Sequence, residues 1–291
     1  MKNFYHFCNE GLKSDIIFRN QGDFIAGMNR VALCYLHCIK TKRDVSVICF
    51  CLMDNHVHYI LHGEREDCEA FCYEYRFLTS IWIGHHRDEK LNSGMEFEGW
   101  PIHSREKLKE KVAYVLRNPV AAGIKTVASG YRWGSGKLMF CDNSDILPLL
   151  RGMSDMSERE KNRILGTRFD IPGDWKILPD GMIWPGCYVQ NVLAEDLFQS
   201  IGEYQFLLND SRIDKQANEE MMSGRVSLPD GDILARANTF ASELLGRRSI
   251  GQCTVPERIT IARILRKEFG CNHKQLSRIT RLDIDDVRKL V

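Results

Sequence analysis

Residues 1–140 are predicted to form an α+β domain, because strand and helix signals follow one another in the order β-α-β-β-α-β, with one more helix after them. Two short segments, 45–53 and 56–63, are rich in β-branched and aromatic residues, and a turn dipeptide joins them, which predicts a hairpin. Longer segments on both sides show apolar residues at helical spacing. This order is that of a ferredoxin-like sandwich, an antiparallel sheet with helices on one face.

Each element rests on its local pattern. The elements predicted in chain order are a strand at Tyr5–Leu12, a helix at about 22–41, strands at 45–53 and 56–63 around the turn Asp54-Asn55, a helix at about Asp67–His86, a strand at Met95–Ile102 and a helix from Ser104 to Asn118. Ser104 is a good helix N-cap. Pro119 is expected to end the last helix, because the residue before a proline avoids the α region.

The remainder of the chain is predicted to be mainly helical and to divide at about residue 231. Residues 141–230 are a connecting region of unknown role, with helices at about Ser157–Leu165 and Val192–Leu208 and turns at the two LPDG strings, 178–181 and 228–231. Residues 231–291 contain a helix that ends before Gly270, a second that starts at Asn272 or Lys274, and a third that closes the chain. Short helices joined by a tight turn are typical of a helix-turn-helix.

The composition indicates an ordinary globular protein. The chain has 291 residues, of which 44% are hydrophobic and 27% charged, so it is neither largely disordered nor fibrous. No apolar run approaches the ~18 residues of a membrane helix, and the first residues show no export signal. The 11 cysteines contain no CxxC pair and are interpreted as reduced thiols, mostly core residues. We therefore expect a cytoplasmic protein.

Charge is unevenly distributed along the chain. Residues 104–140 carry eight basic and two acidic side chains, and 241–291 carry eleven and six, whereas the region between them is acidic. Basic segments can follow nucleic-acid phosphates, although solvated helix faces give the same pattern. The two basic segments are therefore candidate DNA-binding surfaces.

Two pairs of residues have the chemistry of a site. His56 and His58 are two positions apart on a predicted strand, so both side chains project from one face, where they could chelate a divalent metal while Val57 points into the core. Tyr114 and Asn118 are four apart on a predicted helix and share one side of it. Taken singly, each pair has an ordinary explanation: polar positions on an exposed strand, a core aromatic and a helix-end residue.

Together, the strings LMDNHVHYILHG and YVLRNPVAAGI, about fifty residues apart, resemble the REP-associated tyrosine transposases of the single-tyrosine HUH superfamily. Asp54 stands where proline is more usual in that family. Tyr131-Arg132-Trp133 is similar to a downstream segment of the family, and Gly134-Ser135 follows it in place of the more usual serine pair. The resemblance covers residues 1–140, and the stretch 66–103 matches poorly.

The resemblance implies a ferredoxin-like fold and metal-dependent cleavage and joining of single-stranded or hairpin DNA. It implies that Tyr114 is the nucleophile, that His56 and His58 bind the metal and that Asn118 is a third ligand. Ligand chemistry alone permits zinc or manganese, and the resemblance favours Mg²⁺ or Mn²⁺. Attack by Tyr114 would give a covalent 5′-phosphotyrosine and a free 3′-hydroxyl. With one tyrosine, cleavage and joining use the same group or two subunits of a homo-oligomer.

DNA contacts are expected from the basic segments. In the N-terminal segment the candidates are Lys107, Lys111, Arg117, Lys125, Arg132 and Trp133, the last as a base-stacking residue. In the helix-turn-helix they are Lys274, Gln275, Arg278, Arg288 and Lys289. The alternative for each is an exposed cation or, for the tryptophan, a core residue. For the tail as a whole the alternative is a helical subdomain that packs on the protein itself.

The sequence disfavours two other classes of site that contain histidines. A histidine-triad nucleotide hydrolase needs a third histidine where this chain has Ile60, so that class is set aside. A cysteine–histidine metal site lacks a suitably spaced cysteine pair. The serious rival is a DNA-binding regulator that keeps the transposase fold without catalysis.

Overall fold

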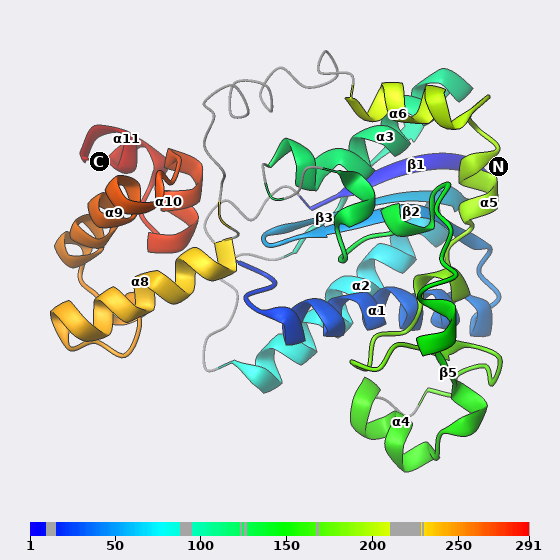
Figure 1. Ribbon diagram of the computed structural model, residues 1–291, viewed down its shortest axis with the longest axis horizontal. Helices are drawn as coiled ribbons and strands as arrows, with labels where there is room; N and C mark the ends of the chain where they lie inside the picture. The colour runs from blue at the N-terminus through cyan, green and yellow to red at the C-terminus, as the bar shows by residue number, and fades with distance from the viewer. Residues whose placement is uncertain are drawn as a thin grey trace.

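The computed structural model describes residues 1–9, 16–87, 95–122, 124, 127–166, 169–209, 228 and 230–290. A four-stranded antiparallel sheet in the order β2-β3-β1-β4 forms the centre of the larger part of the molecule (Figure 1). A separate group of helices, α8 to α11, lies beyond one end of this sheet (Figure 1). The predicted α+β class, with a helical C-terminal region, is confirmed.

The sheet consists of β1 (Asn3–Cys8), β2 (Val45–Met53), β3 (His56–Gly63) and β4 (Glu98–Ile102). The predicted hairpin is present, with Met53 opposite His56. In the register of β1 against β3, Cys8 lies opposite His58 and His6 opposite Ile60. The central strands are therefore β3 and β1, which lie far apart in sequence. The end of the predicted first strand, beyond residue 9, lies outside the described residues.

Helices cover both faces of the sheet. On one face, α1 (Gln21–Lys40) and α2 (Arg65–His86) bury the side chains that alternate as Val57, Tyr59 and Leu61 on β3. On the other face, α3 (Arg105–Ala121) packs against a second core that includes Ile60. The first two helices therefore lie as the predicted sandwich requires, and α3 adds a layer on the opposite face (Figure 1).

The start of α3 agrees with the sequence prediction, but its end does not. The Ser104 hydroxyl oxygen accepts a hydrogen bond from the Lys107 N–H at 3.1 Å, as expected for an N-cap. Pro119 lies inside the helix, which continues to Ala121. A proline in the last turn removes only its own N–H, and the Ala122 N–H still donates to the Asn118 carbonyl at 2.9 Å. The expected stop at Asn118 was therefore wrong.

Residues 131–135 run along the outer edge of β2. The Leu52 N–H donates to the Trp133 carbonyl at 2.8 Å, and the Ser135 N–H donates to the Phe50 carbonyl at 3.0 Å. These bonds cover an edge that would otherwise expose unpaired backbone groups. A Cβ at Gly134 would lie 2.8 Å from the Phe50 carbonyl oxygen, so any side chain at this position would push the segment away from β2.

The region after residue 140 adds small elements to the same two cores. They are β5 (Arg151–Gly152), α4 (Glu158–Leu165), β6 (Lys176–Ile177), α5 (Asn191–Glu195) and α6 (Ile201–Asn209). The helix predicted at Val192–Leu208 is thus two helices, because the Ser200 hydroxyl caps a new start by accepting from the Glu203 N–H at 3.1 Å. Met153 and Tyr188 join the first core and Phe198 joins the second. Where domain boundaries fall stays a prediction.

The C-terminal helices form a unit with its own core. They are α8 (Asp230–Leu245), α9 (Val255–Phe269), α10 (His273–Thr280) and α11 (Ile284–Leu290), and their apolar faces meet in a third cluster. Asn272 caps α10, as the sequence suggested, by accepting from the Gln275 N–H at 2.8 Å. The second LPDG string leads into α8 instead of a free turn. Three residues join α10 to α11, a spacing that suits a helix-turn-helix.

The eleven cysteines are all free thiols, and most are buried. Burial raises the pKa of Cys34, Cys38, Cys68 and Cys72, which lie on α1 and α2, so these thiols stay protonated and act as small core residues. No helix in the described part of the chain is both long and apolar enough to span a bilayer.

One hydrogen bond to the β2 edge gives a test of stability. The buried Tyr131 hydroxyl donates to the Leu52 carbonyl at 2.7 Å. We expect Tyr131→Phe to lower the free energy of unfolding by about 1–3 kcal/mol, because the carbonyl is left buried without this partner. Urea denaturation measures the change. Tyr5→Phe removes a hydroxyl on the sheet that has no hydrogen bond among the described residues, and is the control; equal effects of the two variants would refute the assignment.

Candidate active site

The side chains predicted to form the site face one another: His56 and His58 lie on β3, and Tyr114 lies on α3. His56 and His58 project from the α3 side of β3, and the intervening Val57 enters the opposite core. The rings of His56 and His58 have centroids 4.9 Å apart, and the Tyr114 ring meets that of His58 edge-on at 5.5 Å. The chain therefore places a phenol beside two imidazoles.

Asn118 connects these groups. It lies one turn after Tyr114 on α3, and its side chain is near enough to His56 and His58 to raise the pKa of both imidazoles slightly. Its amide nitrogen also donates to the Tyr114 carbonyl at 3.1 Å. All four residues that the sequence nominated for catalysis and metal binding thus come together at one place, although their roles stay predictions.

His6 belongs to the same cluster and was missed by the sequence reasoning. It lies on β1, its Nε2 is 3.1 Å from His58 Nδ1, and its ring centroid is 5.8 Å from that of Tyr114. Cys8 Sγ lies 3.8 Å from His58 Nε2. A polar residue at an inward position of a predicted strand was the available signal. Its partner, however, is fixed by the register of β1 against β3, which the sequence does not state.

All three imidazoles are held neutral. Burial lowers the pKa of His6 to about 3 and that of His56 to about 4, with smaller contributions from the positive charges of Lys111 and Arg278 respectively. Burial, followed by the neighbouring histidines, lowers the pKa of His58 well below its usual value. A neutral imidazole keeps a lone pair on one ring nitrogen, which is the form that ligates metals.

The donor set fits a divalent metal that keeps open positions. No group of three or more His, Cys, Asp or Glu side chains in the described residues is arranged to hold an ion. The residues that could hold an ion are His56, His58 and the amide oxygen of Asn118, two nitrogens and one oxygen. If His58 donates from Nδ1 to His6, its Nε2 carries the lone pair, which is how an outer partner orients a ligating histidine.

The predicted DNA contacts near the site have varied surroundings. Lys107 is exposed and pairs with Glu110 at 2.7 Å, whereas Arg117 is buried. Arg132 pairs with Asp180. Phe24 stacks on the Trp133 ring at 4.9 Å and the Arg132 guanidinium lies over it at 5.2 Å, so a base would have to displace one of them. Lys125 lies outside the described residues.

Lys111, another of the predicted contacts, packs against the Tyr114 ring. Its ammonium nitrogen lies 5.0 Å from the centre of the Tyr114 ring. The ammonium thus lies over the face of the Tyr114 ring, where a cation is attracted to the electron density of the ring.

The predicted contacts in the helix-turn-helix fall into two groups. Lys274 and Lys289 are exposed, and Arg288 is exposed beside Asp285. Gln275 is buried and donates to Asp230 Oδ1 at 3.0 Å, and Arg278 is paired with the same carboxylate. Gln275 and Arg278 therefore serve an internal network in this structure, and their contact with DNA stays a prediction.

Asp54, in the turn between β2 and β3, is part of that network. Its carboxylate accepts from the Asp230 N–H at 2.5 Å at the start of α8, and its carbonyl accepts from the Ile17 and Phe18 N–H groups. Burial, and then the neighbouring Asp230, raise the pKa of the Asp54 carboxyl. The turn before His56 is thus bonded both to the sheet domain and to the C-terminal helices.

Comparisons with known proteins are sparse. No family model matches the sequence, and no curated protein matches it. Among solved structures, the chain is similar to a REP-associated tyrosine transposase bound to a REP hairpin, with 15% identity, coverage of 46% of this chain and 76% of that chain, and a TM-score of 0.36. A structural likeness this weak does not indicate a function. The function proposed below is inferred from the residues of this chain.

The neutral histidines predict a pH dependence of stability. Their folded-state pKa values lie below the unfolded value of ~6.5, so between about pH 6.5 and 4 the unfolded chain binds protons that the folded chain does not. Stability therefore falls as the pH is lowered through this window. In EDTA, His6→Gln should reduce that slope by up to about 1.4 kcal/mol per pH unit.

Urea denaturation at pH 7.5, 6.0 and 5.0 measures the slope. His85→Gln, which removes an exposed histidine from the last turn of α2, is the matched control. An unchanged slope in His6→Gln would contradict a neutral, buried His6.

Proposed function

We propose that this protein cleaves and rejoins single-stranded or hairpin DNA, with Tyr114 as the nucleophile, and acts as a transposase of the single-tyrosine type. The observation that carries the proposal is the convergence of Tyr114, His58 and Asn118 from two elements far apart in sequence. A half-buried tyrosine packed only for its apolar surface would not require two neutral imidazoles and an amide around it.

Each side chain has a defined part. His56 and His58 hold a divalent metal, Mg²⁺ or Mn²⁺, through ring nitrogens, and Asn118 supplies an amide oxygen. When bound, the ion would act as a Lewis acid that polarises the phosphate oxygens. His6 keeps His58 in one tautomer, and Lys111 places a positive charge beside the phenol.

The covalent step balances without an energy-rich cofactor. The Tyr114 phenol gives up its proton to solvent, its oxygen bonds to phosphorus, and the bond from phosphorus to the 3′-oxygen breaks. The 3′-oxygen takes a proton and leaves as a hydroxyl, while the 5′ end stays attached to Tyr114. A second 3′-hydroxyl can attack this phosphotyrosine and restore a phosphodiester, which joins strands.

The nucleophile is tested by trapping the adduct. Incubation of the full chain with single-stranded hairpin DNA and Mg²⁺ or Mn²⁺ should give a protein–DNA species that survives a denaturing gel. Tyr114→Phe should abolish it, because no oxygen remains to form the bond. Tyr73→Phe, which alters an exposed tyrosine on α2, should leave it unchanged; an adduct that persists in Tyr114→Phe would overturn the assignment.

The metal is tested separately. The double variant His56→Ala with His58→Ala should lower the cleavage rate by about 100-fold or more, since a catalytic metal supplies several kcal/mol, yet retain much of the DNA binding. Full activity in EDTA would contradict the metal. DNA binding without any adduct in the wild-type chain would instead favour the non-catalytic regulator.

A further inference from the structure

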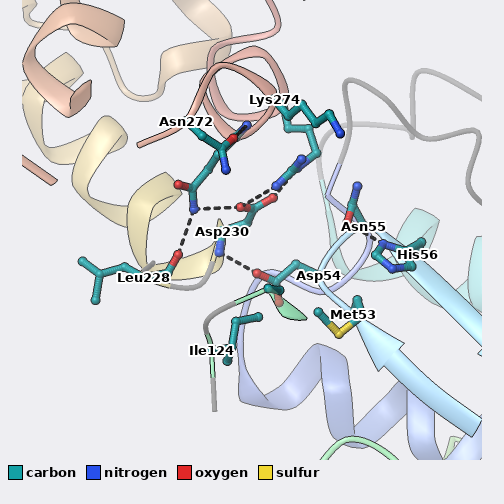
Figure 2. Close-up of a pocket in the computed structure, with 12 residues that line it drawn as sticks. Met53, Asp54, Asn55, His56, Ile124, Leu228, Asp230, Asn272 and Lys274 are labelled. Atoms are coloured by element: carbon teal, nitrogen blue, oxygen red, sulfur yellow. Dashed lines mark hydrogen bonds and ion pairs between the residues drawn. The ribbon is translucent and has the colours of Figure 1, made fainter. Parts of the chain in front are cut away.

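A pocket opens between the candidate active site and the C-terminal helices. It has a volume of about 190 Å³, and its walls come from the β2–β3 turn, the chain just after α3 and α10 (Figure 2). His56 and Asn55 line it from the sheet domain, and Asn272 and Lys274 line it from α10. One wall thus belongs to the metal-binding hairpin and the opposite wall to the helix-turn-helix.

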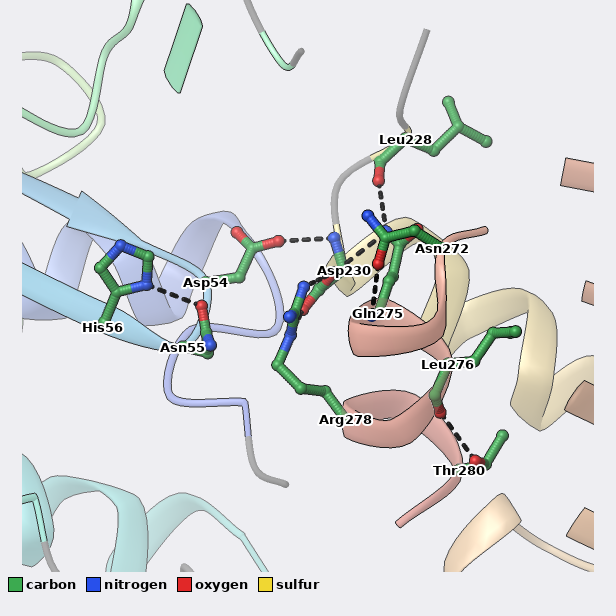
Figure 3. A network of polar contacts seen from close by, with 10 residues as sticks. All are labelled: Asp54, Asn55, His56, Leu228, Asp230, Asn272, Gln275, Leu276, Arg278 and Thr280. Atoms are coloured by element: carbon green, nitrogen blue, oxygen red, sulfur yellow. Dashed lines mark hydrogen bonds and ion pairs between the residues drawn. The ribbon is translucent and has the colours of Figure 1, made fainter. Parts of the chain in front are cut away.

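A bonded network holds the two walls in place (Figure 3). Besides the bond from the Asp230 N–H to Asp54, Arg278 donates to both Asp230 oxygens, at 2.5 and 3.0 Å, and Gln275 donates to the Leu228 carbonyl at 2.8 Å. A Cβ at Gly231 would lie 2.5 Å from the Arg19 carbonyl oxygen, so α8 meets the sheet domain in backbone contact. The pocket is therefore built into the fold.

The lining suits a nucleotide. Apolar side chains of Met53, Ile124 and Leu228 offer surface for the face of a base. The amide oxygens of Asn55 and Asn272 are bonded to His56 and to the Gln275 N–H, but their amide nitrogens offer donors for a base edge, in the manner by which proteins read unpaired bases.

Two acidic and two basic side chains line the pocket, and Lys274 is a cation without an ion pair among the described residues. Asp54 and Asp230 also line the pocket, but Asp54 accepts from the Asp230 N–H, and Asp230 is bonded to Arg278 and Gln275. Lys274 is exposed and has no hydrogen bond or ion pair within the described residues. A lysine in this position is a point charge ready for a phosphate.

We propose that this pocket binds one unpaired nucleotide of the DNA strand next to the phosphodiester that Tyr114 attacks, with Lys274 on its phosphate. The inference rests on the proposed function for the identity of the neighbouring phosphodiester. It adds that the C-terminal helices complete the substrate site and that the strand is read at one position close to the cut.

The experiment measures binding in a Tyr114→Phe background, where cleavage cannot occur. Fluorescence anisotropy of the full chain with labelled hairpin DNA gives the affinity at several salt concentrations. Lys274→Ala should weaken binding by about 3- to 10-fold and reduce the salt slope by about one unit, as expected for loss of one phosphate contact. Lys267→Ala removes an exposed lysine from α9, outside the pocket, and should change both less.

A second variant tests the base. Oligonucleotides with a single abasic site, moved stepwise along the unpaired strand, should show one position at which affinity falls about 10-fold in the parent chain. Ile124→Trp fills the apolar side of the pocket without altering charge and should remove that position-specific loss. Thermal melting checks that each variant is folded.

The outcomes separate the two proposals. Equal effects of Lys274→Ala and Lys267→Ala, or no sensitive position in the abasic series, overturn the pocket even if the adduct forms. A sensitive position that Ile124→Trp abolishes supports the pocket even if no adduct is seen, in which case only the cleavage activity fails.

Discussion

The structure at this end of the molecule depends on one constraint, namely that the polar rings of two histidines are buried beneath α3. His6 and His58 are almost completely buried on the face of the sheet that α3 covers, where an unpaired imidazole nitrogen costs about 1–3 kcal/mol. The structure meets part of this cost within the cluster, because His6 bonds to His58, and the neighbouring His56 bonds to Asn55. The same contacts fix the orientations of the rings. The hydrogen bonds that satisfy these buried polar groups therefore also position the residues of the candidate site.

Much of the fold could be predicted because burial imposes a period on the sequence. The segment 45–53 was identified as a strand with the bounds that the structure has, since it contains only residues suited to a buried sheet. The alternation at His56, Val57 and His58 correctly separated the site face from the core face. Tyr114 and Asn118 could be placed on one side of a helix for the same reason, namely that a helix repeats at about 3.6 residues.

What the sequence did not reveal depends on contacts between distant segments. His6 reaches the site only through strand pairing, and no local pattern states which strands are neighbours. The predicted helix end before Pro119 was wrong, because the cost of a proline in a helix depends on how many turns of helix follow it. Gln275 and Arg278 both bond to a single carboxylate, Asp230, a contact that their helical positions do not predict. Charge and helical position alone cannot separate an internal ion pair from an external one.

The hydrogen bond between Asp54 and the first turn of α8 has a consequence for how the C-terminal helices dock on the sheet domain. A carboxylate at the start of a helix is favoured by the helix dipole and by the free N–H groups there, and here the carboxylate comes from the hairpin that carries the histidines. The C-terminal helices are thus bonded to the sheet domain through a residue that lies two positions before His56. Because the donor is a backbone N–H, Asp54 specifies where a helix begins and places no demand on the side chains of that helix.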